Sequence, residues 1–173
     1  MGTPEQAPTD ADPLVAIYPK ALPQVYGYLL PRCGSVALAE DLTAETFMAA
    51  LAATRSGRSQ ELTIAWLVGI ARHKLVDHWR RKAREERALA SVDAAAEAVD
   101  DPWHERLDGE AAHAALAQLP IPQRMALTLR YLDGLSVAEV AEHVGRSVRA
   151  TETLLVRAKA ALRRVYREAE CDG

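Results

Sequence analysis

The stretch from Leu135 to Ala161 constrains the fold of this chain most, because its pattern is typical of two helices joined by a tight turn. Apolar residues recur at helical spacing up to Val144, and Gly145, a residue type that commonly ends a helix and turns the backbone, follows directly. Ser147 is then placed to cap a second helix. The inward positions predicted for that helix are Leu154, Leu155, Ala158 and Leu162. The pattern predicts a helix-turn-helix.

The second helix of this motif leaves a set of polar side chains for its other faces. They are Arg146, Arg149, Glu152, Thr153, Arg157 and Lys159. A helix that buries one side and presents Arg, Glu and Thr near its N-terminus suits the major groove of DNA. An ordinary helical hairpin on the protein surface is the alternative for this segment taken alone.

Composition favours an all-α protein with segregated charge. The chain has 173 residues, enough for one domain or two small ones, with 49% hydrophobic residues, a single Phe and few β-branched runs. The net charge is only -3, yet basic residues dominate 72–87 and 146–167, and acidic residues dominate 93–110. Two basic segments separated by an acidic one suggest two nucleic-acid contacts. Solvated helix faces are the alternative explanation for each run.

Residue types that carry chemistry are sparse. Cys33 and Cys171 form no CxxC pair, so we expect neither a zinc site nor a disulfide framework. Four histidines without metal-ligand spacing are interpreted as surface or hydrogen-bonded residues: His78, His104, His113 and His143. The sequence has no Gly-rich phosphate loop and no convincing nucleophile–base set. We therefore expect no enzyme activity, no metal and no cofactor.

The N-terminus and the overall hydropathy bear on the compartment. Residues 1–12 are acidic and proline-rich without an apolar signal core, and we expect them to be disordered. No apolar run approaches the length of a membrane span. We therefore expect a soluble, cytoplasmic protein.

Helical periodicity divides the chain into two parts. A first domain is predicted over 13–87, with interruptions at Pro19 and Pro23. Its second helix should be capped by Ser35, run over 37–54 and present the apolar residues Leu38, Leu42, Phe47 and Leu51. A polar loop over 55–60 should precede a helix over 63–87, with the apolar stripe Ile64, Leu67, Val68, Ala71, Leu75 and Trp79.

A linker over 88–108 separates this part from a second domain over 109–168, followed by a tail over 169–173. The second domain should begin with a short helix over 110–119. Pro122 should open the next helix, which we expect to continue through Leu132 and to stop at Asp133 and Gly134. The helix-turn-helix completes the domain, and its last helix should run to about Arg167.

Three segments in this order resemble a known family. They are AEDLTAETF (39–47), WLVGIARHKLVDHWRR (66–81) and LPIPQRMALTLRYLDGLSVAEVAEHVG (119–145). Together they resemble a bacterial extracytoplasmic-function, or group IV, RNA polymerase sigma factor, and the resemblance covers about residues 14–165. It implies core RNA polymerase and promoter DNA as partners, and an anti-sigma factor as a regulator. The alternative is a stand-alone helix-turn-helix regulator with a sensing or dimerising N-terminal domain, which needs neither of the first two segments.

The resemblance implies that the first segment docks on the clamp of the polymerase. The residues assigned to this contact are Glu40, Asp41, Leu42, Glu45 and Phe47. The carboxylates would pair with basic polymerase residues. The alternative is an acidic turn near the helix N-terminus that interacts favourably with the helix dipole. For Phe47, a place in the core and a place in the interface are held equal. The family usually has Gln where this chain has Ala44, so one polar contact is absent here.

The second segment combines tryptophan with basic residues, as proteins that hold single-stranded DNA do. The resemblance implies that it melts the minus-ten element. The residues assigned to it are Arg55, Arg58, Trp66, Arg72, His73, Lys74, Asp77, Arg80 and Arg81. His73 stands where the family commonly carries Asn. Asp77 is expected to orient a basic neighbour, and Trp79 is expected to pack in the core. For Trp66, core packing and contact with single-stranded DNA are held equal.

The third segment leads into the helix that the family places in the major groove of the minus-thirty-five element. The residues assigned to this contact are Arg146, Ser147, Arg149, Ala150, Glu152, Thr153, Arg157 and Lys159. Arg149 could read guanine and Glu152 could accept from cytosine N4. Family members often carry a basic residue where Glu152 stands and Thr where Ala150 stands, so a promoter sequence does not carry over.

Overall fold

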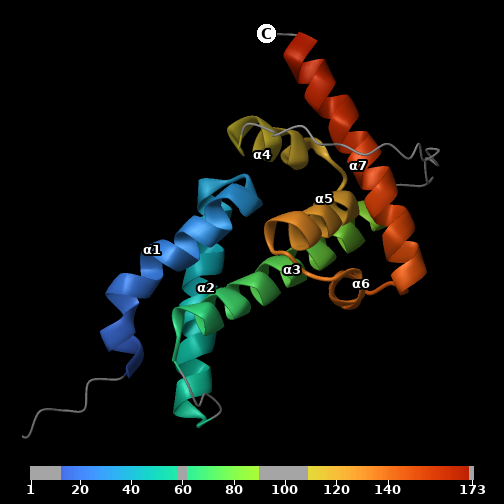
Figure 1. Cartoon of the computed structure of the whole chain (residues 1–173). Helices are drawn as coiled ribbons and strands as arrows, with labels where there is room; N and C mark the ends of the chain where they lie inside the picture. The colour runs from blue at the N-terminus through green and yellow to red at the C-terminus, as the bar shows by residue number, and fades with distance from the viewer. Residues whose placement is uncertain (1–12, 58–61, 90–108, 172–173) are drawn as a thin grey trace, which may run out of the picture. The chain divides into compact units, whose positions relative to one another are not determined.

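The computed structural model describes residues 13–57, 62–89 and 109–171, and every element within them is helical (Figure 1). The all-α prediction is confirmed. The expected disorder of 1–12, most of the linker 88–108 and Arg58 lie outside the described residues. The elements are α1 (Pro13–Cys33), α2 (Val36–Arg55), α3 (Ile64–Leu89), α4 (Gly109–Gln118), α5 (Ile121–Leu127), the π-helix η1 (Thr128–Leu132), α6 (Val137–Val144) and α7 (Val148–Cys171).

The chain forms two compact units that divide between Lys74 and Leu75, within α3. The first unit holds α1, α2 and the first half of α3. The second holds the rest of α3 together with α4 to α7. This division lies inside a continuous helix, and the domain bounds expected from the sequence, 13–87 and 109–168, stay a prediction.

Helix α1 is continuous, so the prolines that were predicted to kink or break it do not break it. Pro19, Pro23 and Pro31 all lie inside it. Pro19 and Pro23 are exposed, so water can reach the carbonyls that lose an amide donor at each proline. The opposite face buries residues at a four-residue spacing that packs against α2: Ala21, Val25, Leu29 and Cys33. Burial, partly opposed by Arg32, raises the pKa of the Cys33 thiol to about 11.

Helix α2 begins where Ser35 was expected to cap it, because the Ser35 hydroxyl accepts from the Leu38 amide at 3.4 Å. The predicted apolar face is wrong in three of its four positions, since only Leu42 is buried and the others stay partly exposed. The buried residues are instead mostly small: Ala39, Leu42, Thr43, Thr46 and Ala50. The buried hydroxyls of Thr43 and Thr46 donate to backbone carbonyls four residues back, both at 2.7 Å, which satisfies them inside a close helix–helix contact.

The second unit is built around α7, which packs on α4, α5 and α6. Trp79 is 2% exposed, which confirms its predicted place in the core. All four predicted inward residues of the last helix are buried as well: Leu154, Leu155, Ala158 and Leu162. That helix extends to Cys171, beyond its predicted end at Arg167.

The helix opened by Pro122 does not continue unchanged to Leu132 as predicted. It ends at Leu127 and is followed by the π-helix η1, closed by a 3.0 Å bond from the Asp133 amide to the Thr128 carbonyl. The extra residue per turn leaves two large side chains at the surface, Tyr131 at 53% and Leu132 at 42% exposed. No described helix is both long and apolar enough to cross a membrane.

Candidate functional site

The helix-turn-helix has the local geometry that its sequence predicts. Ser136 caps α6 reciprocally with Glu139, a capping box that the sequence analysis did not use. Gly145 then adopts a left-handed conformation, with φ of 67° and ψ of 41°. Ser147 follows as the cap of α7, since its hydroxyl accepts from the Ala150 amide at 3.3 Å. The left-handed turn at Gly145 and the cap at Ser147 together fix the start of α7.

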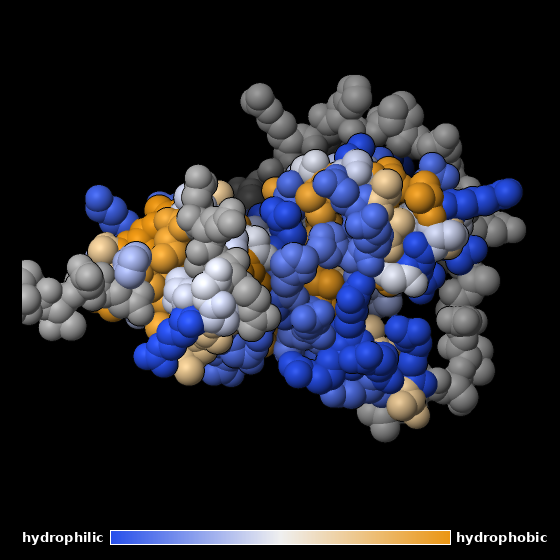
Figure 2. Space-filling model, turned by 90° about the horizontal axis from the view of Figure 1, so that it is seen from below, coloured by the Kyte–Doolittle hydropathy of each residue, from blue (hydrophilic) through white to orange (hydrophobic). Residues whose placement is uncertain are grey.

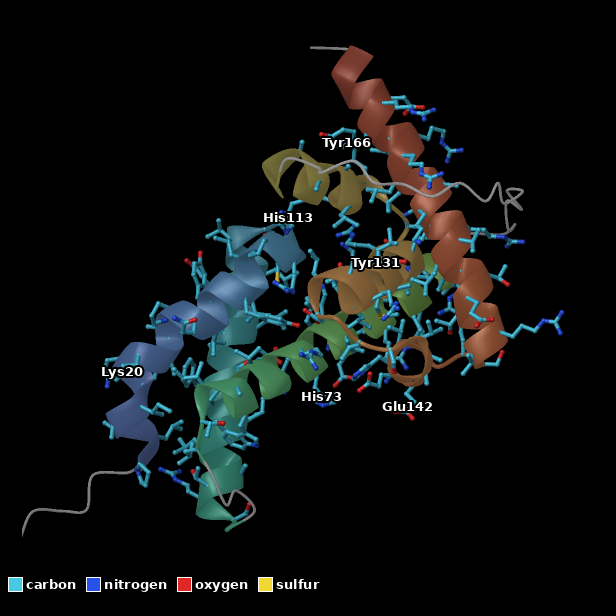
Figure 3. All side chains as sticks on the ribbon, in the orientation of Figure 1. Lys20, His73, His113, Tyr131, Glu142 and Tyr166 are labelled. Atoms are coloured by element: carbon cyan, nitrogen blue, oxygen red, sulfur yellow. The ribbon has the colours of Figure 1, made fainter. Side chains whose placement is uncertain are left out.

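The residues assigned to the minus-thirty-five contact lie mostly at the surface. Exposed members are Arg146, Ser147, Arg149, Glu152, Thr153 and Arg157, while Ala150 and Lys159 are half-buried. The Lys159 ammonium lies 5.0 Å from the centre of the Tyr131 ring, a labelled residue in Figure 3. The Ser147 hydroxyl accepts the capping bond from the Ala150 amide. Among the described residues, no side-chain hydrogen bond or ion pair engages Arg146, Arg149, Glu152 or Arg157.

The first half of α3 carries part of the minus-ten assignment. His73 is exposed (Figure 3). Trp66 is half-buried. Lys74 forms an ion pair at 3.5 Å with Glu45 of α2, a residue assigned to the polymerase contact. The structure therefore joins two residues that the sequence placed in different contacts. Because both side chains are substantially exposed, such a pair is weak and can exchange for an external partner.

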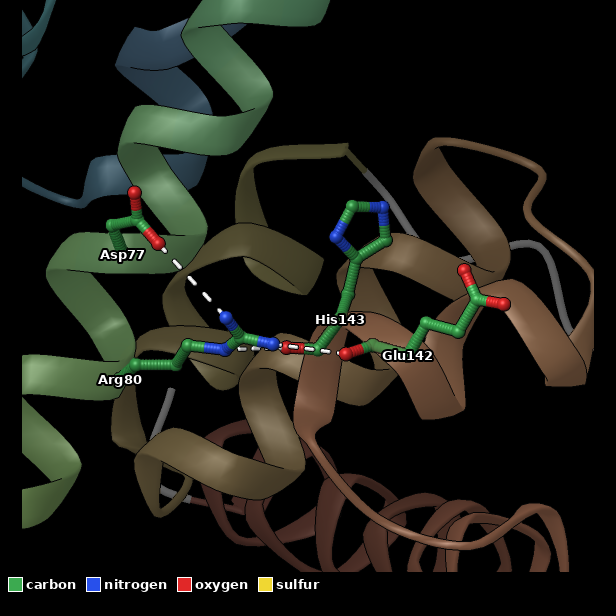
Figure 4. A network of polar contacts seen from close by, with 4 residues as sticks. All are labelled: Asp77, Arg80, Glu142 and His143. Carbon is green, nitrogen blue, oxygen red and sulfur yellow. Dashed lines mark hydrogen bonds and ion pairs between the residues drawn. The ribbon is translucent and has the colours of Figure 1, made fainter.

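In the second half of α3, Arg80 is held by neighbouring groups of the same unit (Figure 4). Its Nε donates to the His143 carbonyl at 2.7 Å and a terminal nitrogen donates to the Glu142 carbonyl at 2.9 Å. These carbonyls end α6, where the helix dipole favours a cation. Asp77 lies 4.0 Å from the guanidinium, which agrees with the expectation that it orients a basic neighbour. No sequence signal pointed to the contact with α6.

Helix α2 carries three acidic residues, one of which, Glu40, lines an apolar groove. Glu40, Asp41 and Glu45 are exposed, whereas Leu42 is buried in the core and is not available at the surface. Phe47 is half-buried and packs edge-on against Tyr18 of α1, with ring centroids 4.8 Å apart. The groove has a volume of about 540 Å³ and is lined by Tyr18, Leu22, Pro23, Tyr26, Glu40, Thr43, Ala44 and Phe47. The α1 residues of this lining were not singled out from the sequence.

In Figure 2, orange hydrophobic residues gather in one region, at the left of the view. Large hydrophobic residues exposed in the first unit include Val15 at 64% and Met48 at 67%. Exposed apolar area beside acidic groups is typical of a surface that binds protein. Within the described residues, no three His, Cys, Asp or Glu side chains gather as metal ligands would.

Comparison with known proteins gives the family. The family model described as Sigma-70 region 2 matches residues 17–85, and the one described as Sigma-70, region 4 matches residues 109–162. The ECF RNA polymerase sigma factor SigF of Caulobacter vibrioides is 39% identical over 134 residues, which are 76% of this chain and 72% of SigF. The chain belongs to the ECF sigma factors of the sigma-70 family.

A second relative is the ECF sigma factor BldN of Streptomyces coelicolor, which is 37% identical over 164 residues; the match covers 90% of this chain but only 61% of BldN. A solved sigma factor shares the fold: RpoE from Bartonella quintana, crystallised with the anti-sigma factor NepR, has a TM-score of 0.55 at 24% identity, covering 91% of this chain and 98% of that one. Both matched regions of this ECF sigma factor contain residues that the sequence analysis had selected.

Proposed function

We propose that this chain binds core RNA polymerase, recognises two promoter elements and directs transcription initiation. The observation that carries the proposal is the pairing, in one chain, of a region 2 match holding an acidic helix beside an apolar groove with a region 4 match holding an exposed recognition helix. A stand-alone regulator needs only the second of these. The chain itself performs no covalent chemistry, and the polymerase supplies the active site.

In this proposal Glu40, Asp41 and Glu45 pair with basic residues of the polymerase, and Phe47 contributes apolar contact from the groove wall. The exposure of all three carboxylates supports this assignment. Leu42 acts indirectly, because its burial fixes the helix that carries the acids. An anti-sigma factor that covers this surface would block the polymerase contact, and we propose such a protein as the regulator.

The minus-ten element is assigned to the exposed side of α3 and the half-buried Trp66. Bases that leave the duplex stack can pack on an aromatic ring while Arg and Lys hold the phosphates. The minus-thirty-five element is assigned to the start of α7, where the Ser147 cap positions Arg149 and Glu152 for base edges. Arg157 is assigned to phosphate contact, which fixes register and carries no sequence information.

The direct test is run-off transcription with purified core polymerase and a promoter mapped in the native host. We expect start sites that depend on this chain, and binding to core in a pull-down. In a gel shift, the free chain should bind duplex DNA poorly, whereas a stand-alone regulator would bind its operator without polymerase. Tight operator binding without core association would contradict the proposal.

A further inference from the structure

A small cavity in the second unit is lined by arginines. Its volume is about 240 Å³, and its lining is Arg80, Ala83, Arg84, Arg87, Pro122, Met125, Val144 and Arg146. Half of these residues are arginine and the others are apolar or proline. No carboxylate of the described residues is among them. We call this set the arginine pocket.

The fold brings these charges together from two distant segments. Arg80, Arg84 and Arg87 follow one another at helical spacing on one face of α3. Arg146 comes directly after Gly145, whose left-handed conformation turns the chain between α6 and α7. Met125 and Val144 contribute apolar side chains to the lining. The pocket is thus a product of tertiary structure.

Two of the four guanidinium groups donate hydrogen bonds to carbonyls of the second unit, and two do not. Arg80 is fixed by the two carbonyls at the end of α6, and Arg87 donates from Nε to the Ala83 carbonyl at 3.1 Å. The guanidinium groups of Arg84 and Arg146 have no hydrogen bond or ion pair with any described residue. Four like charges around one small cavity repel each other, so an anion placed there would be stabilised by all of them.

The chemistry of the lining selects the anion. The planar fork of an arginine matches phosphate oxygens in bidentate geometry, and several arginines suit a chain of phosphates. A duplex presents its phosphates on a convex backbone, whereas this lining surrounds a small concave space. The apolar residues offer contact to a sugar or base attached to the phosphates. We propose that the arginine pocket binds a small molecule carrying a di- or triphosphate, such as a nucleotide.

The site does not depend on the proposed function, but its consequence does. Arg80 and Arg146 are also assigned to promoter DNA. A polyphosphate bound in the arginine pocket would neutralise both side chains and compete with DNA for them. Ligand binding would then lower promoter affinity, and the level of the phosphorylated molecule would be sensed by the free sigma factor before it joins the polymerase.

The test is calorimetric titration of the full-length chain with magnesium-free inorganic pyrophosphate and, in parallel, with sulfate. The free chain is used because the polymerase itself handles phosphates. We expect saturable binding of pyrophosphate that is clearly tighter than that of sulfate. The double variant Arg84→Gln/Arg146→Gln should weaken it at least about tenfold, because it removes two of the four charged donors that line the pocket.

The matched control is Lys20→Gln/Arg167→Gln, which removes the same charge from exposed positions outside the pocket (Lys20 is labelled in Figure 3). It should bind pyrophosphate as the wild type does. If the double variant unfolds, Arg84→Lys/Arg146→Lys keeps the charge, and an intermediate loss of affinity supports bidentate binding. Absence of binding by the wild type, equal loss in both double variants, or equal affinity for sulfate would overturn the proposal.

A further outcome separates this site from the DNA contact. If pyrophosphate does not bind but Arg84→Gln/Arg146→Gln loses affinity for promoter DNA in the holoenzyme, the arginines serve DNA alone and the small-molecule proposal is wrong. If pyrophosphate binds but run-off transcription fails with wild-type chain, the proposed function fails and the ligand site remains.

Discussion

Helices α2 and α7 both bury one face in a core, but they bury and expose different types of residue. This difference matches the partners proposed for them. Helix α2 buries mainly alanines and threonines. Its Phe47 is only half-buried and its Met48 is exposed, on a helix that also presents acidic side chains. Helix α7 buries its leucines and shows mainly polar residues. Apolar area at the surface favours a protein partner, whereas an interface with DNA is polar and basic.

The largest effect should come from reversing a charge on the exposed face of α2. Asp41→Arg places a cation opposite basic polymerase residues, so we expect run-off transcription and core pull-down to fall to background. Because Asp41 is exposed, the circular dichroism spectrum and thermal midpoint should stay those of the wild type. The control is Glu168→Arg, which makes the same charge change at an exposed position of α7 and should transcribe normally. Normal transcription by Asp41→Arg would remove α2 from the polymerase contact.

On α7 the largest effect should be on stability. Leu154→Ala truncates a side chain that is 9% exposed, and we expect the free energy of unfolding to drop by about 2–5 kcal/mol in urea denaturation. The paired test on α2 is Phe47→Ala, which we expect to cost less because the ring is only half-buried. An equal or larger loss for Phe47→Ala would show that its ring belongs to the core, and the contrast between the two helices would fail.

A change of specificity should follow from the polar face of α7. Glu152→Lys replaces an acceptor by a donor near the start of the helix, so the preferred upstream sequence should change. The expected discrimination is about 1–3 kcal/mol at one base pair, read by sequencing run-off products from a randomised minus-thirty-five library. An unchanged preference would place Glu152 outside the base contacts.

Removing the hydroxyl that caps each helix should change stability by a smaller amount. Ser147→Ala removes the hydroxyl that caps α7 and should lower stability by about 0.5–2 kcal/mol. Ser35→Ala should fall in the lower part of that range, since its bond to the Leu38 amide is 3.4 Å long and exposed. Thermal unfolding at several urea concentrations measures both. A larger loss for Ser35→Ala would mean that the α2 cap is the stronger one.

The smallest effect should come from the buried threonines of α2. Thr46→Val keeps the shape of the side chain and removes one hydroxyl that donates to a helix carbonyl. That carbonyl can retain its backbone partner, so no buried group is left without a hydrogen bond, and the loss should stay within about 1 kcal/mol. Thr46→Leu should cost about 1–3 kcal/mol, because Thr46 is 0% exposed and extra carbons in a packed interior force neighbouring side chains to shift. A neutral Thr46→Leu would indicate looser packing.

Local signals predicted much of the second unit and less of the first. Gly145, Ser147 and the leucines of α7 are read from spacing alone, because caps and amphipathic stripes depend on residues a few positions apart. The apolar face of α2 was mispredicted because large apolar residues were assumed to point inward. Its actual buried face was selected by how closely α1 and α2 approach, which no periodicity within one helix records.

The sequence by itself determined the helical content, the turn at Gly145 and the cap at Ser147, since each follows from the backbone preferences of a few adjacent residues. Only tertiary structure decided the continuity of α1 through its prolines, the placement of Arg80 on the end of α6, and the gathering of Arg80, Arg84, Arg87 and Arg146 around one cavity. These features join groups up to 66 residues apart in sequence, from Arg80 to Arg146 (146 − 80), and such contacts exist only once the helices have packed.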